Sequence, residues 1–387
     1  MKLATLLILA GLASAGAEPA IRPGDRIAIV GNTFADQLRI HGYLETLLLH
    51  HTEGKPVSIR NLGWGGDMLS ARDRPTNFAT EESTLTAHET DVIIACFGMG
   101  ESFAGEAGLA NFNADLEAFI ESHRGKIYNG KTAVRLILVS PIASEDHGDR
   151  TPKNAERNRN LEAYSKEMGK VSRAAKIPFI DLFEPTRYHM SEPATQKFTT
   201  NGIHLNSYGY WAVSRILYGQ LTEAKSQPWR LSLDAENALE FEITDPAGPT
   251  LSPPVDGSLP PQLANFRDTL LVENLDPGAW RLEIDGQAVA SATHEEWSEG
   301  VVIDSSPIHQ EAEEFRQAVN DKNLQFTYSW KALNQVHIVG ERKKSNSGQA
   351  LPAEVIEFNR LAEERDEALR KGSELKTRTW QLVPQKP

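Results

Sequence analysis

The chain has almost no cysteine: Cys96 is the only one among its 387 residues, so no disulfide can form within it. It also has no surplus of basic residues, because 40 Lys and Arg stand against 53 Asp and Glu, which gives a net charge of -13. An acidic surface repels phosphate backbones, and this argues against nucleic acid as a partner. Beyond the N-terminus no apolar run is long enough to cross a bilayer, so we expect no stable membrane span in the mature chain.

The N-terminus carries the most continuous apolar run of the chain. Lys2 precedes the apolar residues 3–12, and two A-x-A patterns follow, which end at Ala15 and at Ala17. A basic, then apolar, then small-residue order is typical of a cleaved signal peptide. The alternative is a membrane anchor, but about ten residues are too few to span a bilayer comfortably. We therefore expect residues 1–17 to be a signal peptide and the protein to be exported, to a periplasm or to the medium.

Short continuous apolar runs alternate with helical patterns over the first two-thirds of the chain. Continuous runs are typical of strands in a parallel sheet, because helices cover both of its faces. Cys96 lies in one of these runs, and we expect it to be a small buried side chain. The alternation predicts a doubly wound, flavodoxin-like α/β domain with five parallel strands over residues 21–225. The expected strands are 26–30, 57–62, 92–97, 134–140 and 177–182, and the expected helices are 35–50, 109–123, 154–175 and 207–221.

Beyond this domain, apolar and polar residues alternate instead. Residues 280–284 form one such set, as do 229–233 and 239–243, and a period of two predicts half-buried antiparallel strands. The dipeptide Asp285-Gly286 predicts a hairpin turn.

We therefore expect a β-rich accessory domain over residues 226–387, with a long loop at 246–261 and two helices. One helix starts at Ser306-Pro307, and the other covers about 352–371. Five of the seven tryptophans lie in this region, and they have two interpretations. They are sugar-stacking rings of a binding module or core residues of a small domain, and the alternating pattern favours the second.

Polar and glycine-rich residues of the first domain stand where the expected strands end. In an open α/β sheet, ligands bind at this edge. The four blocks found there are Gly31-Asn32-Thr33-Phe34, Gly63-Trp64-Gly65-Gly66-Asp67, Gly98-Met99-Gly100-Glu101 and, late in the domain, Asn201-Gly202-Ile203-His204.

In this order and spacing, the four blocks resemble those of the SGNH (GDSL) hydrolases, over about residues 25–222. The resemblance implies an esterase-like or lipase-like hydrolase that uses no cofactor. It also implies that the usual serine nucleophile is replaced by threonine. The positions that the resemblance assigns are the nucleophile at Thr33, the base at His204, the orienting acid at Asn201, the oxyanion donors at Gly66 and Gly100, and the aspartate of the first block at Asn32.

Only Gly66 and His204 keep the residue type of the family. A threonine hydroxyl can attack a carbonyl once a base removes its proton, although its methyl group crowds the attack. Asn201 has no charge with which to stabilise an imidazolium, and its amide can hold the ring in the wrong tautomer. Gly100 lacks a side-chain donor, and the loss of one such donor typically lowers the rate by about a hundred- to a thousandfold.

Two carboxylates, Asp67 and Glu101, adjoin these blocks and are candidate substrate-binding residues. One interpretation is that either of them orients or replaces a base. The other is that Asp67 caps a helix and that Glu101 is a solvated loop charge. The eleven histidines show no close cluster with Asp, Glu or Cys, so we predict no metal.

Three functions are consistent with this sequence. The first is an exported ester hydrolase that acts on a small-molecule or carbohydrate ester, with acyl groups on carbohydrate as one substrate class. The second is a catalytically degenerate member that binds acylated glycans without turnover, motivated by the changed site positions. The third is a structural or interaction role in the cell envelope. The sequence leaves the oligomeric state open.

Overall fold

The computed structural model describes most of the chain, with gaps that include both ends. The expected signal peptide at 1–17, most of the expected loop at 246–261 and Trp229 lie outside the described residues. Within the described part, no helix is both long and apolar enough to cross a membrane. The described residues are 20–51, 55–72, 74, 79–191, 196–222, 230–235, 238–245, 251–254, 268–303, 305–331 and 353–385.

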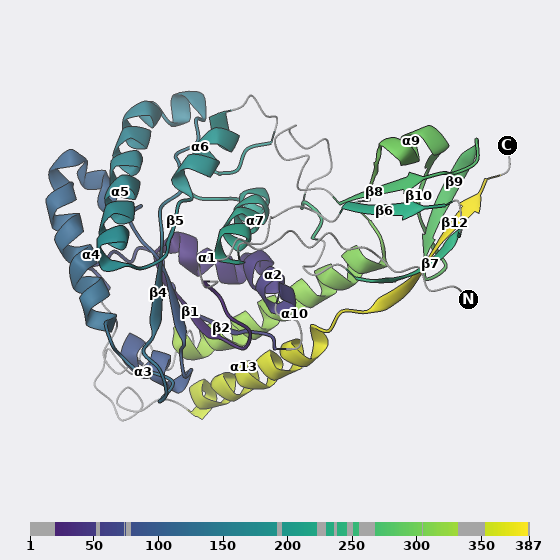
Figure 1. Cartoon of the computed structure of the whole chain (residues 1–387). Helices are drawn as coiled ribbons and strands as arrows, with labels where there is room; N and C mark the ends of the chain where they lie inside the picture. The colour runs from purple at the N-terminus through teal and green to yellow at the C-terminus, as the bar shows by residue number, and fades with distance from the viewer. Residues whose placement is uncertain are drawn as a thin grey trace.

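A five-stranded parallel sheet forms the centre of the larger body (Figure 1). Its order is β2-β1-β3-β4-β5, which is the flavodoxin-like order, and each neighbouring pair is parallel. The predicted α/β domain and its five strands are thus confirmed. Successive strands are added on one side of β1 (β2) and then on its other side (β3 to β5), so the strand order reverses between β1 and β3, and the loops after these strands lie where such folds bind ligands. The strands are β1 (Arg26–Gly31), β2 (Ser58–Asn61), β3 (Val92–Cys96), β4 (Arg135–Val139) and β5 (Phe179–Ile180).

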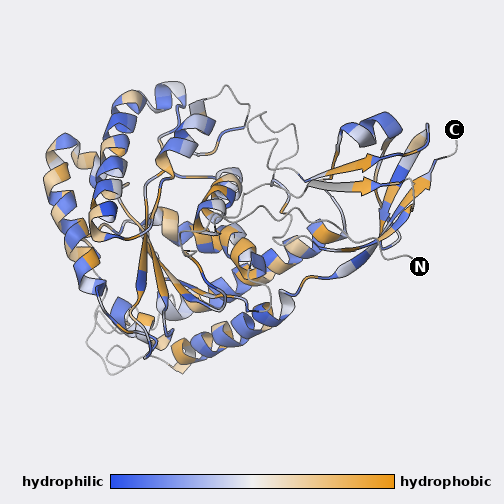
Figure 2. Cartoon of the chain, in the orientation of Figure 1, coloured by the Kyte–Doolittle hydropathy of each residue, from blue (hydrophilic) through white to orange (hydrophobic). Residues whose placement is uncertain are grey.

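Helices cover both faces of this sheet. Apolar side chains of α1, α2 and α7 form one core with the strands, and those of α4 and α5 form a second core on the opposite face. In Figure 2 the strands are largely hydrophobic, while the outer helices are mixed, as expected for strands buried on both faces. The helices are α1 (Thr33–His41), α2 (Tyr43–His51), α3 (Glu81–Ala87), α4 (Leu109–His123), α5 (Asn154–Ala175), α6 (Phe183–Ser191) and α7 (Ser207–Thr222), with short 3-10 turns η1 (Glu101–Ala104), η2 (Glu106–Gly108) and η3 (Gly148–Arg150).

The helix predicted over 35–50 is two helices in the structure. The chain breaks at Gly42, which takes the left-handed conformation with φ 68°. A Cβ at this position would lie 2.2 Å from Oδ1 of Asn320, on the later helix α10 (Pro307–Trp330). The left-handed backbone therefore favours glycine here, and any Cβ would also have to displace the Asn320 side chain of α10.

The strands of the C-terminal region form two small sheets that share one apolar core. The predicted hairpin is confirmed, because Asp285 and Gly286 both have positive φ and join β9 to β10. The expectation of antiparallel pairing is wrong for β6, which pairs in parallel with β8. These elements are β6 (Arg230–Asp234), β7 (Glu240–Thr244), β8 (Thr269–Glu273), β9 (Ala279–Ile284), β10 (Gln287–Thr293), β11 (Val301–Val302) and β12 (Thr377–Pro384), with the short helix α9 (His294–Glu299).

The four described tryptophans beyond residue 225 are buried, which confirms the core interpretation for them. Trp280, Trp297 and Trp380 belong to the core of the small sheets. Trp330 instead lies in the second core of the α/β domain, at the end of α10.

Two long helices from the C-terminal region, α10 and α13 (Ala353–Gly372), pack against each other and against the β2 edge of the central sheet. In Figure 1 they run side by side beneath that edge, toward the small sheets. Buried ionic contacts fix them there: Lys322 of α10 donates to Glu45 and to the Ile59 carbonyl, and Arg60 contacts Asp366 of α13 at 3.1 Å. Residues from the end of the chain are thus part of the larger body.

Candidate active site

The loops after β1, β2 and β3 are bound to one another at the carboxyl edge of the sheet. The Trp64 amide donates to the Gly31 carbonyl at 2.9 Å, and the Asn32 amide donates to the Cys96 carbonyl at 3.3 Å. Gly31 approaches β3 so closely that a Cβ would lie 2.2 Å from the Cys96 oxygen. The first three sequence blocks therefore meet at one place, as their positions at strand ends predict.

Thr33, at the nucleophile position, is the first residue of α1. Asn32 precedes it as the N-cap, and its side-chain oxygen accepts the Phe34 amide at 3.0 Å. The Thr33 hydroxyl accepts a hydrogen bond of 3.3 Å from the amide of Gly66, which has φ 89°. Because few side chains adopt such a φ, glycine is needed to aim this amide at the hydroxyl. The hydroxyl thus has a backbone donor and belongs to the first residue of a helix, the end with the positive partial charge.

His204, at the base position, is exposed and is held by Asn201. The Asn201 oxygen accepts the backbone amides of His204 at 3.0 Å and of Ile203 at 3.3 Å. This fixes the orientation of the side-chain amide, so its NH₂ group faces Nδ1 of the ring at 2.9 Å. Nδ1 must then accept, and the proton of the neutral ring lies on Nε2. The described residues show no hydrogen bond between this ring and Thr33.

The loop that carries His204 is anchored by a buried carboxylate that the sequence did not point to. Glu145 accepts the amides of Phe198 and Thr199 at 3.1 and 2.8 Å, and also the Thr199 hydroxyl at 2.7 Å. Its own amide donates to the Gly202 carbonyl at 2.8 Å. The separation of more than fifty residues along the chain leaves no local pattern from which this role could be predicted.

Met68 occupies the space into which a side chain at position 100 would extend. A Cβ on Gly100 would lie 2.9 Å from Cγ and 3.2 Å from Sδ of Met68. A glycine and a thioether from the neighbouring loop thus stand together at the position that the sequence resemblance assigns to an oxyanion donor. At this position the Met68 side chain offers an apolar surface and no amide donor.

We expect Gly100→Asn to destabilise the protein by about 1–3 kcal/mol, the usual cost of overpacking. The backbone at Gly100, with φ -66° and ψ -47°, suits any residue, so the cost comes from the contact with Met68. Urea unfolding of Gly100→Asn and of Gly100→Asn/Met68→Ala would measure this effect. A Gly100→Asn variant as stable as the wild type would contradict the conclusion that Met68 fills the space beside Gly100.

The two candidate carboxylates hold loops and do not touch the Thr33 hydroxyl or the His204 ring within the described chain. Asp67 receives two bonds from Arg74, at 2.9 and 2.6 Å, while burial raises the pKa of its carboxyl. Glu101 accepts the amides of Leu69 and Gly98, both at 2.9 Å, and burial likewise raises the pKa of its carboxyl. The expectation that Glu101 is a solvated loop charge is wrong, because it joins the loops after β2 and β3. Among the described residues, no three His, Cys, Asp or Glu side chains gather as a metal site would.

Comparisons with known proteins agree with this geometry. Residues 24–212 match the model of the GDSL-like lipase/acylhydrolase family. A gut microbial diltiazem-metabolizing enzyme has a similar structure, with a TM-score of 0.66 and 13% identity, over 94% of this chain and 98% of that one. The similarity therefore includes the C-terminal region as well as the central sheet.

Two further solved structures match only about half of this chain. An acetylxylan esterase from Geobacillus stearothermophilus, solved as a catalytic mutant, has a TM-score of 0.42 and 14% identity, over 52% of this chain and 96% of that one. A lipase/acylhydrolase from Enterococcus faecalis has a TM-score of 0.36 and 19% identity, over 51% and 95%. A search of curated proteins by sequence found no match. On the match of the family model, residues 24–212 of this chain form a GDSL-like lipase/acylhydrolase domain.

Proposed function

We propose that the protein is a slow hydrolase of acyl esters, with Thr33 as its nucleophile and His204 as its base. The observation that carries this proposal is the 3.3 Å hydrogen bond from the Gly66 amide to the Thr33 hydroxyl, at the start of α1. A hydroxyl beside a fixed backbone donor can form an acyl intermediate, and the same donor can stabilise the negative charge that develops.

In the proposed reaction, Nε2 of His204 takes the Thr33 proton while Oγ1 attacks the ester carbonyl. The carbonyl oxygen becomes an oxyanion beside the Gly66 amide. Collapse of this intermediate breaks the bond to the alcohol, which leaves with the proton from His204. Water then attacks the acyl-enzyme with the same base, releases the carboxylic acid and restores the Thr33 hydroxyl.

Asn201 makes the first proton transfer slow. Nε2 can accept a proton only in the tautomer with hydrogen on Nδ1, and in that tautomer Nδ1–H would face the NH₂ group of Asn201. Turning the amide over would instead direct this NH₂ group at two backbone amides that now donate to its oxygen. The active tautomer is therefore reached only at a cost in free energy.

We place the substrate outside the cytoplasm and among small-molecule or carbohydrate esters. The signal-peptide pattern at residues 1–17 supports export. The exposed His204 and the half-buried Thr33 support access for an acyl group on a larger molecule, such as an acetylated sugar.

Thr33→Ala is expected to lower turnover by about tenfold or more, because no hydroxyl remains to accept the acyl group. The assay is hydrolysis of nitrophenyl acetate and of acetylated xylo-oligosaccharides by the purified protein, together with mass spectrometry of an acyl group on Thr33. Ser70→Ala, at an exposed serine of the same loop as Gly66, is the matched control and should retain full activity. Unchanged turnover by Thr33→Ala would exclude this nucleophile.

The orientation of Asn201 favours a second candidate function, the binding of acylated glycans without turnover. With its proton on Nε2, His204 is a hydrogen-bond donor that suits an ester carbonyl. Calorimetric titration with acetylated and deacetylated oligosaccharides would test it. Preference for the acetylated form, without product or acyl-enzyme, would support binding over hydrolysis.

A further inference from the structure

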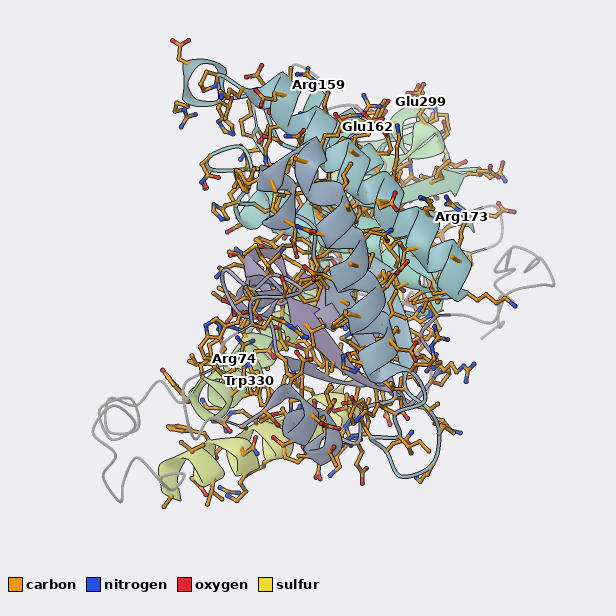
Figure 3. The ribbon with its side chains drawn as sticks, turned by 90° about the vertical axis from the view of Figure 1, so that its left-hand side faces the viewer. Arg74, Arg159, Glu162, Arg173, Glu299 and Trp330 are labelled. Atoms are coloured by element: carbon orange, nitrogen blue, oxygen red, sulfur yellow. The ribbon has the colours of Figure 1, made fainter. Side chains whose placement is uncertain are left out.

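Trp64 lies in the loop that carries Gly66, and groups from other parts of the chain surround its ring. The Arg74 guanidinium lies 4.6 Å from the ring centroid, and the Lys331 ammonium lies 5.0 Å from it. Trp330 meets the same ring edge-on, with centroids 6.2 Å apart. Figure 3 labels Arg74 and Trp330 close together at the end of α10. The end of a C-terminal helix thus contacts the loop of the oxyanion glycine directly.

Lys331 also contacts the helix that carries the nucleophile. Its ammonium lies 2.7 Å from a carboxylate oxygen of Asp36, and these side chains are only 10% and 8% exposed. Asp36 is in the first turn of α1, three residues after Thr33. One ammonium group therefore joins α1 to the Trp64 ring, and a buried contact of this kind holds both partners more firmly than an exposed one.

Arg74 holds the other side of the same loop. Its guanidinium makes two bonds to Asp67, stacks on Trp64 and lies 5.9 Å from the Trp330 ring centroid. Trp64 and Asp67 are the residues on either side of Gly65-Gly66. Both ends of this short glycine segment are thus fixed by side chains outside it, and glycine by itself would leave the segment free to take other conformations.

We propose that Lys331 and Trp330 are positioning residues of the acyl site, which set the loop of Gly66 against α1 and so bring the Gly66 amide to the Thr33 hydroxyl. This inference rests on the proposed hydrolase function. It assigns the C-terminal region a part in the site, because α10 ends at Trp330 and Lys331 follows it directly. A displacement of about 1 Å in a catalytic group can lower the rate by about a hundredfold. A small displacement of this loop should therefore lower the rate measurably.

Lys331→Met tests the proposal, because it removes the ammonium but keeps an unbranched apolar side chain. Asp36 retains Arg39 as a partner at 2.8 Å, so the variant should still fold. We expect kcat for nitrophenyl acetate to fall by about ten- to a hundredfold with KM within about twofold, because the loss is one of alignment. Lys331→Arg should restore most of the rate, since a guanidinium can meet both Asp36 and the ring. Arg365→Met is the matched control, since it removes an exposed α13–α10 ion pair with Asp321 and should leave kcat unchanged.

Hydrogen exchange separates failure of this proposal from failure of the proposed function. If neither the wild type nor any variant hydrolyses esters, the hydrolase function fails, and the exchange of the Trp64 and Asp67 amides still tests the positioning role. Lys331→Met should speed their exchange, while Lys331→Arg and Arg365→Met should not. Unchanged exchange at this loop, or unchanged kcat in an active protein, would overturn the proposal.

Discussion

Replacing Asn201 by aspartate should raise kcat/KM for acyl esters by about a hundred- to ten-thousandfold. The reverse change in a serine protease lowers the rate by about ten-thousandfold. The lower estimate, about a hundredfold, allows for Thr33 and Gly100, which also limit the rate at this site. Aspartate is nearly isosteric with asparagine, so one of its oxygens can still accept the His204 and Ile203 amides. Its other oxygen would accept a hydrogen bond from Nδ1–H, where the Asn201 NH₂ group now donates to Nδ1 at 2.9 Å. The ring would then present a free lone pair on Nε2 toward its substrate side, and the charged form of the ring would gain a partner.

The measurement is steady-state hydrolysis of nitrophenyl acetate by the wild type, Asn201→Asp and Asn201→Asp/Thr33→Ala. The double variant must lose the gained activity, because the restored base acts only through the Thr33 hydroxyl. Asn201→Ala serves as the control for a simple loss of the hydrogen bond: it frees Nδ1 but leaves the ring without a partner, so it should gain much less activity than Asn201→Asp. If Asn201→Asp is no faster than the wild type, the tautomer of His204 is not what limits the reaction.

Much of this site follows from the order of its residues in the sequence. Thr33 and Gly66 stand after neighbouring parallel strands, and such strands end at one edge, so their contact could be predicted. The tautomer of His204 could not be predicted from the sequence, because it depends on which way the Asn201 amide faces. That orientation is set by the two backbone amides of a turn, and the sequence does not specify their direction.

The other features that the sequence did not predict depend on contacts between distant parts of the chain. Met68 crowds the space beside Gly100 only because the loops after β2 and β3 lie next to each other there. The strands of the central sheet were predictable from local apolar runs, but the packing of α13 on β2 depends on contacts such as Arg60 to Asp366, which are 306 residues apart. The pattern of an amphipathic helix shows that one face is buried, and it does not show against which element.

Removal of the Glu45 carboxylate should be among the most destabilising single changes in the α/β body. Glu45 of α2 is 5% exposed, and it receives the ammonium of Lys322, which is 0% exposed, together with the Asn323 amide at 2.8 Å. Burial raises the pKa of the Glu45 carboxyl, and Lys322 opposes the rise. Because the pKa is raised, ionisation of Glu45 by itself costs the folded state stability. Its main role is to neutralise an ammonium group that has no access to water.

Glu45→Ala is therefore expected to lower the free energy of unfolding by about 3–5 kcal/mol, because it leaves a buried charge without its partner. Tm should fall by on the order of 10 °C. Glu45→Gln/Lys322→Met is the informative control: it removes both charges and keeps the volume, so it should recover most of the lost stability. Urea unfolding would give the three free energies. A double variant as unstable as Glu45→Ala would mean that the loss reflects packing at the junction of α2 and α10, and the role assigned to the charge pair would be wrong.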